Sequence, residues 1–213
     1  MKRRNYFKFI VYLFAAMVFS SARADALVDF FRAVHLDDAR TVQRLLAQGV
    51  DPNVLNDKGQ PALFVAMRDE SVAVAAALLA HPKIQPDLAN ASNETPLMMA
   101  ALRGNLPLAE QLLARGAAVN RAGWTPLHYA ATGPETRLVA LLLDRGAAIE
   151  AAAPNRSTPL MMASRYGPET SVDLLLARGA SLQARNDQGM NAADFAGSAG
   201  RESLARRLAA ATR

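Results

Sequence analysis

The feature that most limits how this chain can fold is a six-residue motif that recurs three times at nearly constant spacing. Each copy reads Thr-Pro-Leu, then two variable residues, then Ala, at 95–100, 125–130 and 158–163. A leucine pair follows each motif leucine by fifteen residues, and a glycine follows each pair by three. A period of roughly 33 residues is typical of repeat proteins, in which each unit buries its apolar face against the next. The chain should therefore fold as a linear stack.

Weaker copies of the same pattern flank the three clear ones. Gly59–Ala66 leads to a leucine pair at 78–79, and Gly189–Ala196 opens a truncated last copy. We expect six repeats, at about 25–57, 58–90, 91–120, 121–153, 154–186 and 187–213. The first and last are the most degenerate, as expected for terminal units whose outer face meets water.

The residue types within each copy predict helices. The motif threonine is a good N-cap, and the proline after it suits the first helical position, where its missing N–H is not needed. In the third copy, Leu97, Ala100 and Ala101 fall on one face of the first helix. Three glycines are placed to end the second helices in a left-handed conformation: Gly116, Gly146 and Gly179. The predicted fold class is all-α.

The complete motif Thr125-Pro-Leu-His-Tyr-Ala130, with its period and terminal glycine, resembles the ankyrin repeat. The resemblance extends over 25–213. It implies a solenoid of helix–turn–helix repeats joined by short β-turn fingers, with a concave face of finger tips and first helices that binds proteins. It also implies that His128 forms hydrogen bonds between repeats. The junction over Asn120–Gly123 is three residues shorter than the next junction, so its finger should be short.

The first 24 residues have the layout of a signal peptide. Residues 1–8 are basic, Phe9–Phe19 is an uninterrupted apolar run, and a segment of small residues ends at Ala24. We expect cleavage after Ala24 and a mature chain that is periplasmic or secreted. The apolar run would be about 16 Å long as a helix, short for a hydrocarbon core of roughly 30 Å, so a membrane anchor is the weaker interpretation. Arg3 and Arg4 leave the twin-arginine route open beside the general secretory route, which the strongly apolar run favours.

Charge and composition limit the chemistry that this chain can perform. The whole chain carries +5, but residues 1–24 hold five basic residues and no acidic one, so the remainder is neutral. A neutral chain has no electrostatic reason to bind nucleic acid. Cysteine is absent, and the three histidines lie in different repeats at non-equivalent positions. We therefore expect no catalytic residues, no cofactor and no metal, and a monomer whose mature part does not insert into a membrane.

Side chains that the stack does not need are the candidates for binding. Trp124, the only tryptophan, precedes a first helix at a position that the ankyrin pattern leaves variable, and aromatics in such places are frequent hot spots. Packing against the short finger is the alternative role for Trp124. Equivalent first-helix positions are predicted to face the groove: Val65, Met99, Tyr129, Met162 and Phe195. The rim of this face would comprise Leu102, Arg103, Arg165 and Tyr166. The methionines have an alternative role as simple cover for the inner helices.

These features predict a non-catalytic module that binds a partner protein outside the cytoplasm through its concave face. Two other classes of function stay open. One is a protective or structural factor of the cell envelope that acts through weak contacts, and the other is an inhibitor or immunity-type protein that blocks a toxin. The fold alone does not choose between them.

Overall fold

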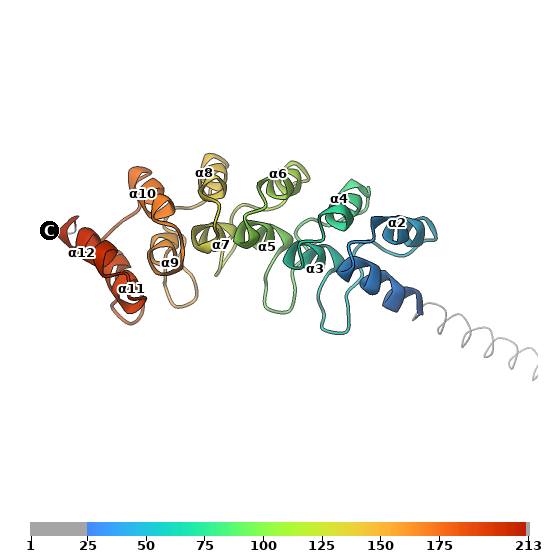
Figure 1. The fold of residues 1–213 in the computed structure, drawn as a ribbon, viewed down its shortest axis with the longest axis horizontal. Helices are drawn as coiled ribbons and strands as arrows, with labels where there is room; N and C mark the ends of the chain where they lie inside the picture. The colour runs from blue at the N-terminus through green and yellow to red at the C-terminus, as the bar shows by residue number, and fades with distance from the viewer. Residues whose placement is uncertain (1–24, 212–213) are drawn as a thin grey trace, which may run out of the picture.

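The computed structural model describes residues 25–211 as a row of stacked helical hairpins (Figure 1). The helices are one over residues 25–35, α2 (Ala39–Ala47), α3 (Ala62–Arg68), α4 (Val72–Ala80), α5 (Pro96–Arg103), α6 (Leu106–Ala114), α7 (Pro126–Thr132), α8 (Thr136–Asp144), α9 (Pro159–Tyr166), α10 (Glu169–Ala177), α11 (Ala192–Ser198) and α12 (Glu202–Ala211). Each of the six predicted repeats holds two consecutive helices of this series. The predicted all-α class is confirmed. The predicted signal peptide, residues 1–24, lies outside the described residues.

The helices form two layers (Figure 1). The first helices of the repeats lie side by side in one layer, in which α5 packs on α7 and α7 packs on α9. The second helices α4, α6, α8 and α10 form the other layer, and the fingers project from the first helices on the side away from it. The first helices and the fingers together make the surface on which the predicted binding residues lie.

Three of the first helices, α5, α7 and α9, begin where the motif predicts, at a threonine followed by proline. The hydroxyl of Thr95 accepts a hydrogen bond from the backbone N–H of Met98 at 3.3 Å, and the Met98 sulfur accepts one from the Thr95 N–H at 3.4 Å. Thr158 and Met161 repeat this arrangement in the fifth repeat. The motif glycines end the second helices with positive φ, which confirms their predicted left-handed role: Gly116 at 88°, Gly146 at 84° and Gly179 at 93°.

The core runs continuously between the two layers. The motif leucines Leu97, Leu127 and Leu160 are buried, and so is the first member of each leucine pair. In the three clear copies the second member of the pair is only partly buried and packs against the edge of this core: Leu113, Leu143 and Leu176. The repeating leucines thus bind each hairpin to its neighbours, and a hairpin removed from the row would expose them.

Polar side chains also join neighbouring repeats at the base of the fingers. Asn120 accepts a hydrogen bond from the N–H of Ala148 and donates one to the carbonyl oxygen of Gly146, each at 2.8 Å. Asp87 accepts a bond from the N–H of Ala118 at 2.9 Å. Two further residues play this part at other junctions: Asn53, with Lys83 and Gln85, and Glu150, with Ser181. These bonds satisfy backbone groups that the turn after a second helix leaves unpaired.

The finger before α7 is short, as the sequence predicts, and Figure 1 shows it projecting less far than the fingers before α3 and α5. Residues 25–211 contain no β-strand, and an isolated antiparallel bridge joins Leu55 to Pro61 across the base of the first finger. Within the same range no helix is long and apolar enough to span a bilayer.

Candidate functional site

A small pocket opens on the first-helix layer between α5, α7 and α9. Its volume is about 220 Å³. Leu102 lines it from α5 and Met162 from α9. The other lining residues are three from α7 and the residue that precedes its N-cap: His128, Tyr129, Thr132 and Trp124. Three of the predicted binding residues, Trp124, Tyr129 and Met162, therefore meet in one pocket, together with the predicted rim residue Leu102.

Trp124 forms one wall of this pocket. It directly precedes Thr125, the N-cap of α7, so the start of the helix fixes the direction in which its side chain leaves the chain. The indole ring stands edge-on to the His128 ring, with centroids 5.2 Å apart and planes at 78°. Trp124 is half-buried, so the ring packs on its own repeat and still presents a face to the pocket.

His128 holds the pocket floor in a single orientation. The N–H of Thr125 donates to Nδ1 of His128 at 3.2 Å, so Nδ1 carries no proton and Nε2 is the donor. Nε2 donates to the carbonyl oxygen of Ser157 at 3.0 Å, in the finger of the next repeat. Burial lowers the pKa of His128 below its ordinary value, against the effect of its backbone hydrogen bonds. The predicted hydrogen bond between repeats is confirmed, and the imidazole is neutral at pH 7.

Tyr129 links the pocket to the finger of the preceding repeat. Its hydroxyl donates to Oε1 of Glu94 at 2.8 Å. Burial, the hydrogen bond and the charge of Glu94 all raise the pKa of Tyr129 above its ordinary value, so the phenol stays protonated. This bond holds the tyrosine ring in place on the pocket wall.

The first-helix side chains that were predicted to face the groove are not equally exposed to solvent. Tyr129 and Met162 are half-buried and line the pocket, whereas Met99 is only 5% exposed. Val65 and Phe195 are buried as well, which corrects the expectation that all five of these side chains face the groove. Met99 therefore supports the neighbouring helices and offers a partner almost no surface, because its side chain is covered within the stack.

The predicted rim residues lie beside the pocket on α5 and α9. Arg103 is 3.7 Å from a carboxylate oxygen of Glu70 in the preceding repeat. The guanidinium of Arg165 lies over the ring of Tyr166, 5.2 Å from its centroid. Tyr166 is 60% exposed. The cationic groups of this face thus lie at both sides of an apolar pocket.

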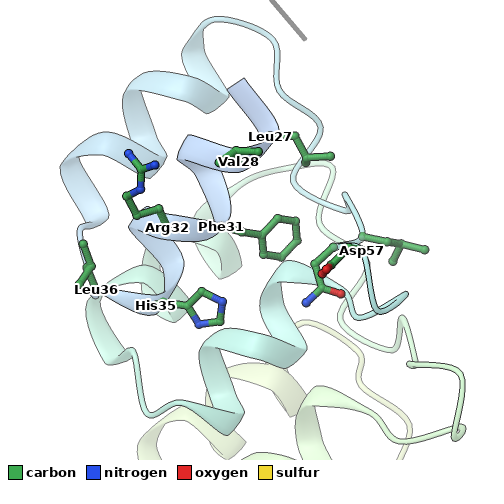
Figure 2. Close-up of a pocket in the computed structure, with 9 residues that line it drawn as sticks. Leu27, Val28, Phe31, Arg32, His35, Leu36 and Asp57 are labelled. Atoms are coloured by element: carbon green, nitrogen blue, oxygen red, sulfur yellow. The ribbon is translucent and has the colours of Figure 1, made fainter. Parts of the chain in front are cut away.

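A second pocket, at the first repeat, was not indicated by any sequence signal. It measures about 710 Å³ and lies between the helix over 25–35 and the first finger (Figure 2). Leu27, Val28 and Phe31 line it from the helix, and Leu55 and Asp57 from the finger. Further along the stack, hydrogen bonds join neighbouring fingers, from Arg121 to Asn93 and from the N–H of Asp187 to the carbonyl oxygen of Asn155. Leu36 is 72% exposed, so the apolar surface here is left uncovered.

Titratable groups elsewhere on this face are engaged with each other. His35 Nδ1 lies 2.6 Å from Oδ2 of Asp69. Burial raises the pKa of Asp69, but hydrogen bonds from Arg68 and His35 outweigh it and leave that pKa below its ordinary value. Within residues 25–211 no group of three metal-ligating side chains comes together. The described surface is suited to binding an apolar group between arginines.

Comparisons with known proteins agree with this architecture. A chain in the solved structure of the predatory endopeptidase Bd0816 from Bdellovibrio bacteriovorus, in complex with immunity protein Bd3460, superposes with a TM-score of 0.74. The sequences are 26% identical, and the match covers 85% of this chain and 97% of that one. A putative palmitoyltransferase, ZDHHC13 of Danio rerio, is 33% identical over 156 residues, or 73% of this chain. The matched region is only 20% of that protein's length.

The sequence pattern of the family described as "Ankyrin repeats (3 copies)" matches residues 30–122, 82–153 and 118–186. These three matches overlap and together cover most of the chain. They coincide with the stacked hairpins and with the threonine caps and terminal glycines described above. The chain therefore belongs to the ankyrin-repeat family.

Proposed function

We propose that this chain is an exported ankyrin-repeat protein that binds a partner protein outside the cytoplasm through the pocket between α5, α7 and α9. The observation that carries the proposal is the convergence of Leu102, Trp124 and Met162 from three successive repeats in one open apolar pocket. The stack does not need an indole at this place, since its leucines already bury the interface between repeats. Half-buried aromatics held in a fixed orientation are typical anchors of protein interfaces.

The place of action rests on the sequence of residues 1–24, whose basic start, short apolar run and small residues before Ala24 are typical of a signal peptide. We expect exported protein to begin at Asp25. N-terminal sequencing of the protein recovered outside the cytoplasm tests this, and a chain that still carries residues 1–24 would overturn it.

A second function, inhibition of an endopeptidase, is favoured by one observation. The matching solved complex pairs an endopeptidase with an immunity protein, and the match spans 97% of the matching chain at 26% identity. A rigid stack can block an enzyme by covering the entrance to its active site without any chemistry of its own. The test is to measure peptide hydrolysis by purified endopeptidases of the same cell envelope with and without the chain. Saturable inhibition at a one-to-one ratio supports this function, and binding without inhibition leaves only the general binding role.

The binding role predicts the effect of truncating the anchor. Trp124→Ala should weaken partner binding at least tenfold, because truncated aromatic anchors commonly cost about 2 kcal/mol or more. The free energy of unfolding should fall by less than about 1.5 kcal/mol, since the indole is only half-buried. Calorimetric binding and urea unfolding of the same variant measure the two effects.

The matched control is Val72→Ala on α4, which removes an exposed apolar group from the other helix layer. It should leave the affinity unchanged. Loss of several kcal/mol of stability by Trp124→Ala, with affinity intact, would show instead that Trp124 serves only the packing of its own repeat.

A further inference from the structure

The pocket between α5, α7 and α9 has the size of one side chain. Its volume of about 220 Å³ equals that of roughly seven waters at about 30 Å³ each. Pockets for drug-sized ligands and cofactors are larger, at roughly 300–1,000 Å³. A single large side chain presented by a partner's surface therefore fits this pocket better than a small-molecule ligand does.

The polar groups that His128, Tyr129 and Thr132 bring to the pocket are already paired within the chain. Both ring nitrogens of His128 have partners in Thr125 and Ser157. The Tyr129 hydroxyl donates to Glu94, and the Thr132 hydroxyl donates to the carbonyl oxygen of Tyr129 at 2.8 Å. The remaining lining residues are Leu102, Trp124 and Met162, whose side chains are apolar except for the indole N–H of Trp124. Such a lining favours an apolar occupant, because a polar one would lose its hydrogen bonds to water without replacement.

Arg165 stands at one side of this pocket. It follows Met162 by three residues on α9, so the two side chains share a face of the helix. Its guanidinium lies over the Tyr166 ring at 5.2 Å, and within residues 25–211 no carboxylate lies within ion-pair distance of it. On the other side of the pocket Arg103 already faces Glu70. A guanidinium that lies over an aromatic ring still has N–H groups available for a carboxylate.

We propose that the partner inserts one large apolar side chain into this pocket and places a neighbouring carboxylate against Arg165. The recognition element is thus a partner segment in which an aromatic or long aliphatic residue is adjacent to Asp or Glu. This inference rests on the proposed binding function and specifies the chemistry of the partner. The apolar residue supplies most of the affinity, and the ion pair sets the register of the segment on the concave face.

Trp124 makes a direct test possible, because it is the only tryptophan of the chain and forms a wall of the pocket. Its indole N–H signal in NMR spectra and its fluorescence report on occupancy at this place. The probes are four capped dipeptides: acetyl-Phe-Glu-amide, acetyl-Glu-Phe-amide, and the same pair with Gln in place of Glu. Acetyl-Ala-Glu-amide is the control for the apolar side chain.

The phenylalanine dipeptides should shift the Trp124 signal, and the alanine dipeptide should not. The better Glu dipeptide should bind about threefold more tightly than its Gln counterpart, as expected for a partly exposed ion pair. Arg165→Gln should remove this preference while leaving the Gln dipeptide unchanged. Arg103→Gln is the matched control and should preserve the preference.

Three results would overturn the inference: no change in the Trp124 signal up to about 20 mM dipeptide, equal binding of the Glu and Gln dipeptides, or loss of the preference in Arg103→Gln instead of Arg165→Gln. The proposed function is tested separately by the partner affinity of Trp124→Ala. If that affinity falls while the dipeptides fail, the binding face stands and the chemistry assigned to its partner is wrong.

Discussion

At the scale of single residues, glycines serve two different purposes in this stack. Gly146 has φ of 84°, and a Cβ there would meet nothing within 4 Å. Gly167 has an ordinary negative φ, but a Cβ there would lie 2.0 Å from the carbonyl oxygen of Ala131 in the preceding repeat. The first glycine is required by backbone conformation and the second by the close approach of two repeats.

This difference predicts the cost of adding a methyl group. Gly146→Ala should lower the free energy of unfolding by about 1 kcal/mol, because only the left-handed conformation is penalised. Gly167→Ala should lower it by more than about 2 kcal/mol, since the repeats must move apart. Urea unfolding of both variants measures this. Equal losses would show that contact between repeats is looser at Gly167 than the structure places it.

His128 gives the stability of the fold a pH dependence. Because burial lowers its pKa in the folded state, the unfolded chain binds a proton first as the pH falls. The contribution of the neutral ring is fully present above the ordinary value of about 6.5 and is lost as the pH falls below it. The wild type should therefore lose more stability between pH 7.5 and 5.5 than the variant His128→Met does. Methionine is the natural residue at the equivalent positions of two other repeats, Met98 and Met161. Urea unfolding at both pH values measures how much unfolding free energy each protein loses. An equal loss in the two proteins would contradict the role given to the buried, neutral His128.

At the scale of elements, the stack is held by leucines between helices and by polar side chains between fingers. Asn120 both accepts from Ala148 N and donates to Gly146 O. Asp87 and Glu150 can only accept, and they serve the junctions on either side. The amide at Asn120 therefore bonds one more backbone group than either carboxylate does, as the amide of Asn53 also does at the first junction.

Substitution at this residue should separate the two bonds. Asn120→Ala is expected to lower the free energy of unfolding by about 1–2 kcal/mol, because it removes both. Asn120→Asp keeps the acceptor and should recover part of this loss. Thermal or urea unfolding of the pair provides the measurement, and a stability of Asn120→Asp below that of the alanine variant would argue against a structural role for the accepted bond.

At the scale of the whole molecule, the two ends of the stack differ. The first repeat leaves an apolar pocket of about 710 Å³ open beside Leu36 and Leu55. The last repeat closes its end with α12, whose buried residues are Leu204 and Leu208. Arg201 precedes α12 and donates to the carbonyl oxygens of Ala163, Ser164 and Gly167 at 2.8–3.1 Å, at the end of α9.

Removing the last repeat, from Asp187 onward, should therefore destabilise the repeats that remain. It would expose the apolar side of the fifth repeat and leave the α9 carbonyl groups without Arg201. We expect loss of stability and concentration-dependent aggregation, measured by light scattering and urea unfolding. Arg201→Lys, which keeps the charge but loses the planar guanidinium, should show a smaller loss of stability and no aggregation. A soluble truncated chain with the stability of the full one would contradict this account of the cap.

Short sequence signals determined where many of the helices of this protein begin and end. The threonine–proline pairs set the starts of α5, α7 and α9, and Gly116, Gly146 and Gly179 set the ends of the second helices. These features depend on backbone conformation over a few neighbouring residues, which is why the sequence shows them. The period then implied the stack, and the short junction before α7 implied the short finger.

The tertiary structure alone decided which side chains meet. Met99 and Met162 occupy equivalent positions in their repeats, yet the first is buried and the second lines a pocket. Accessibility at these positions depends on the side chains of neighbouring repeats, which lie some 30 residues away along the chain. For the same reason the sequence did not reveal the hydrogen bonds of Asn120, the close approach of Gly167 to the preceding repeat or the pocket at the first repeat. A repeat pattern specifies what each unit is, whereas the contacts between units follow from residues in which the units differ.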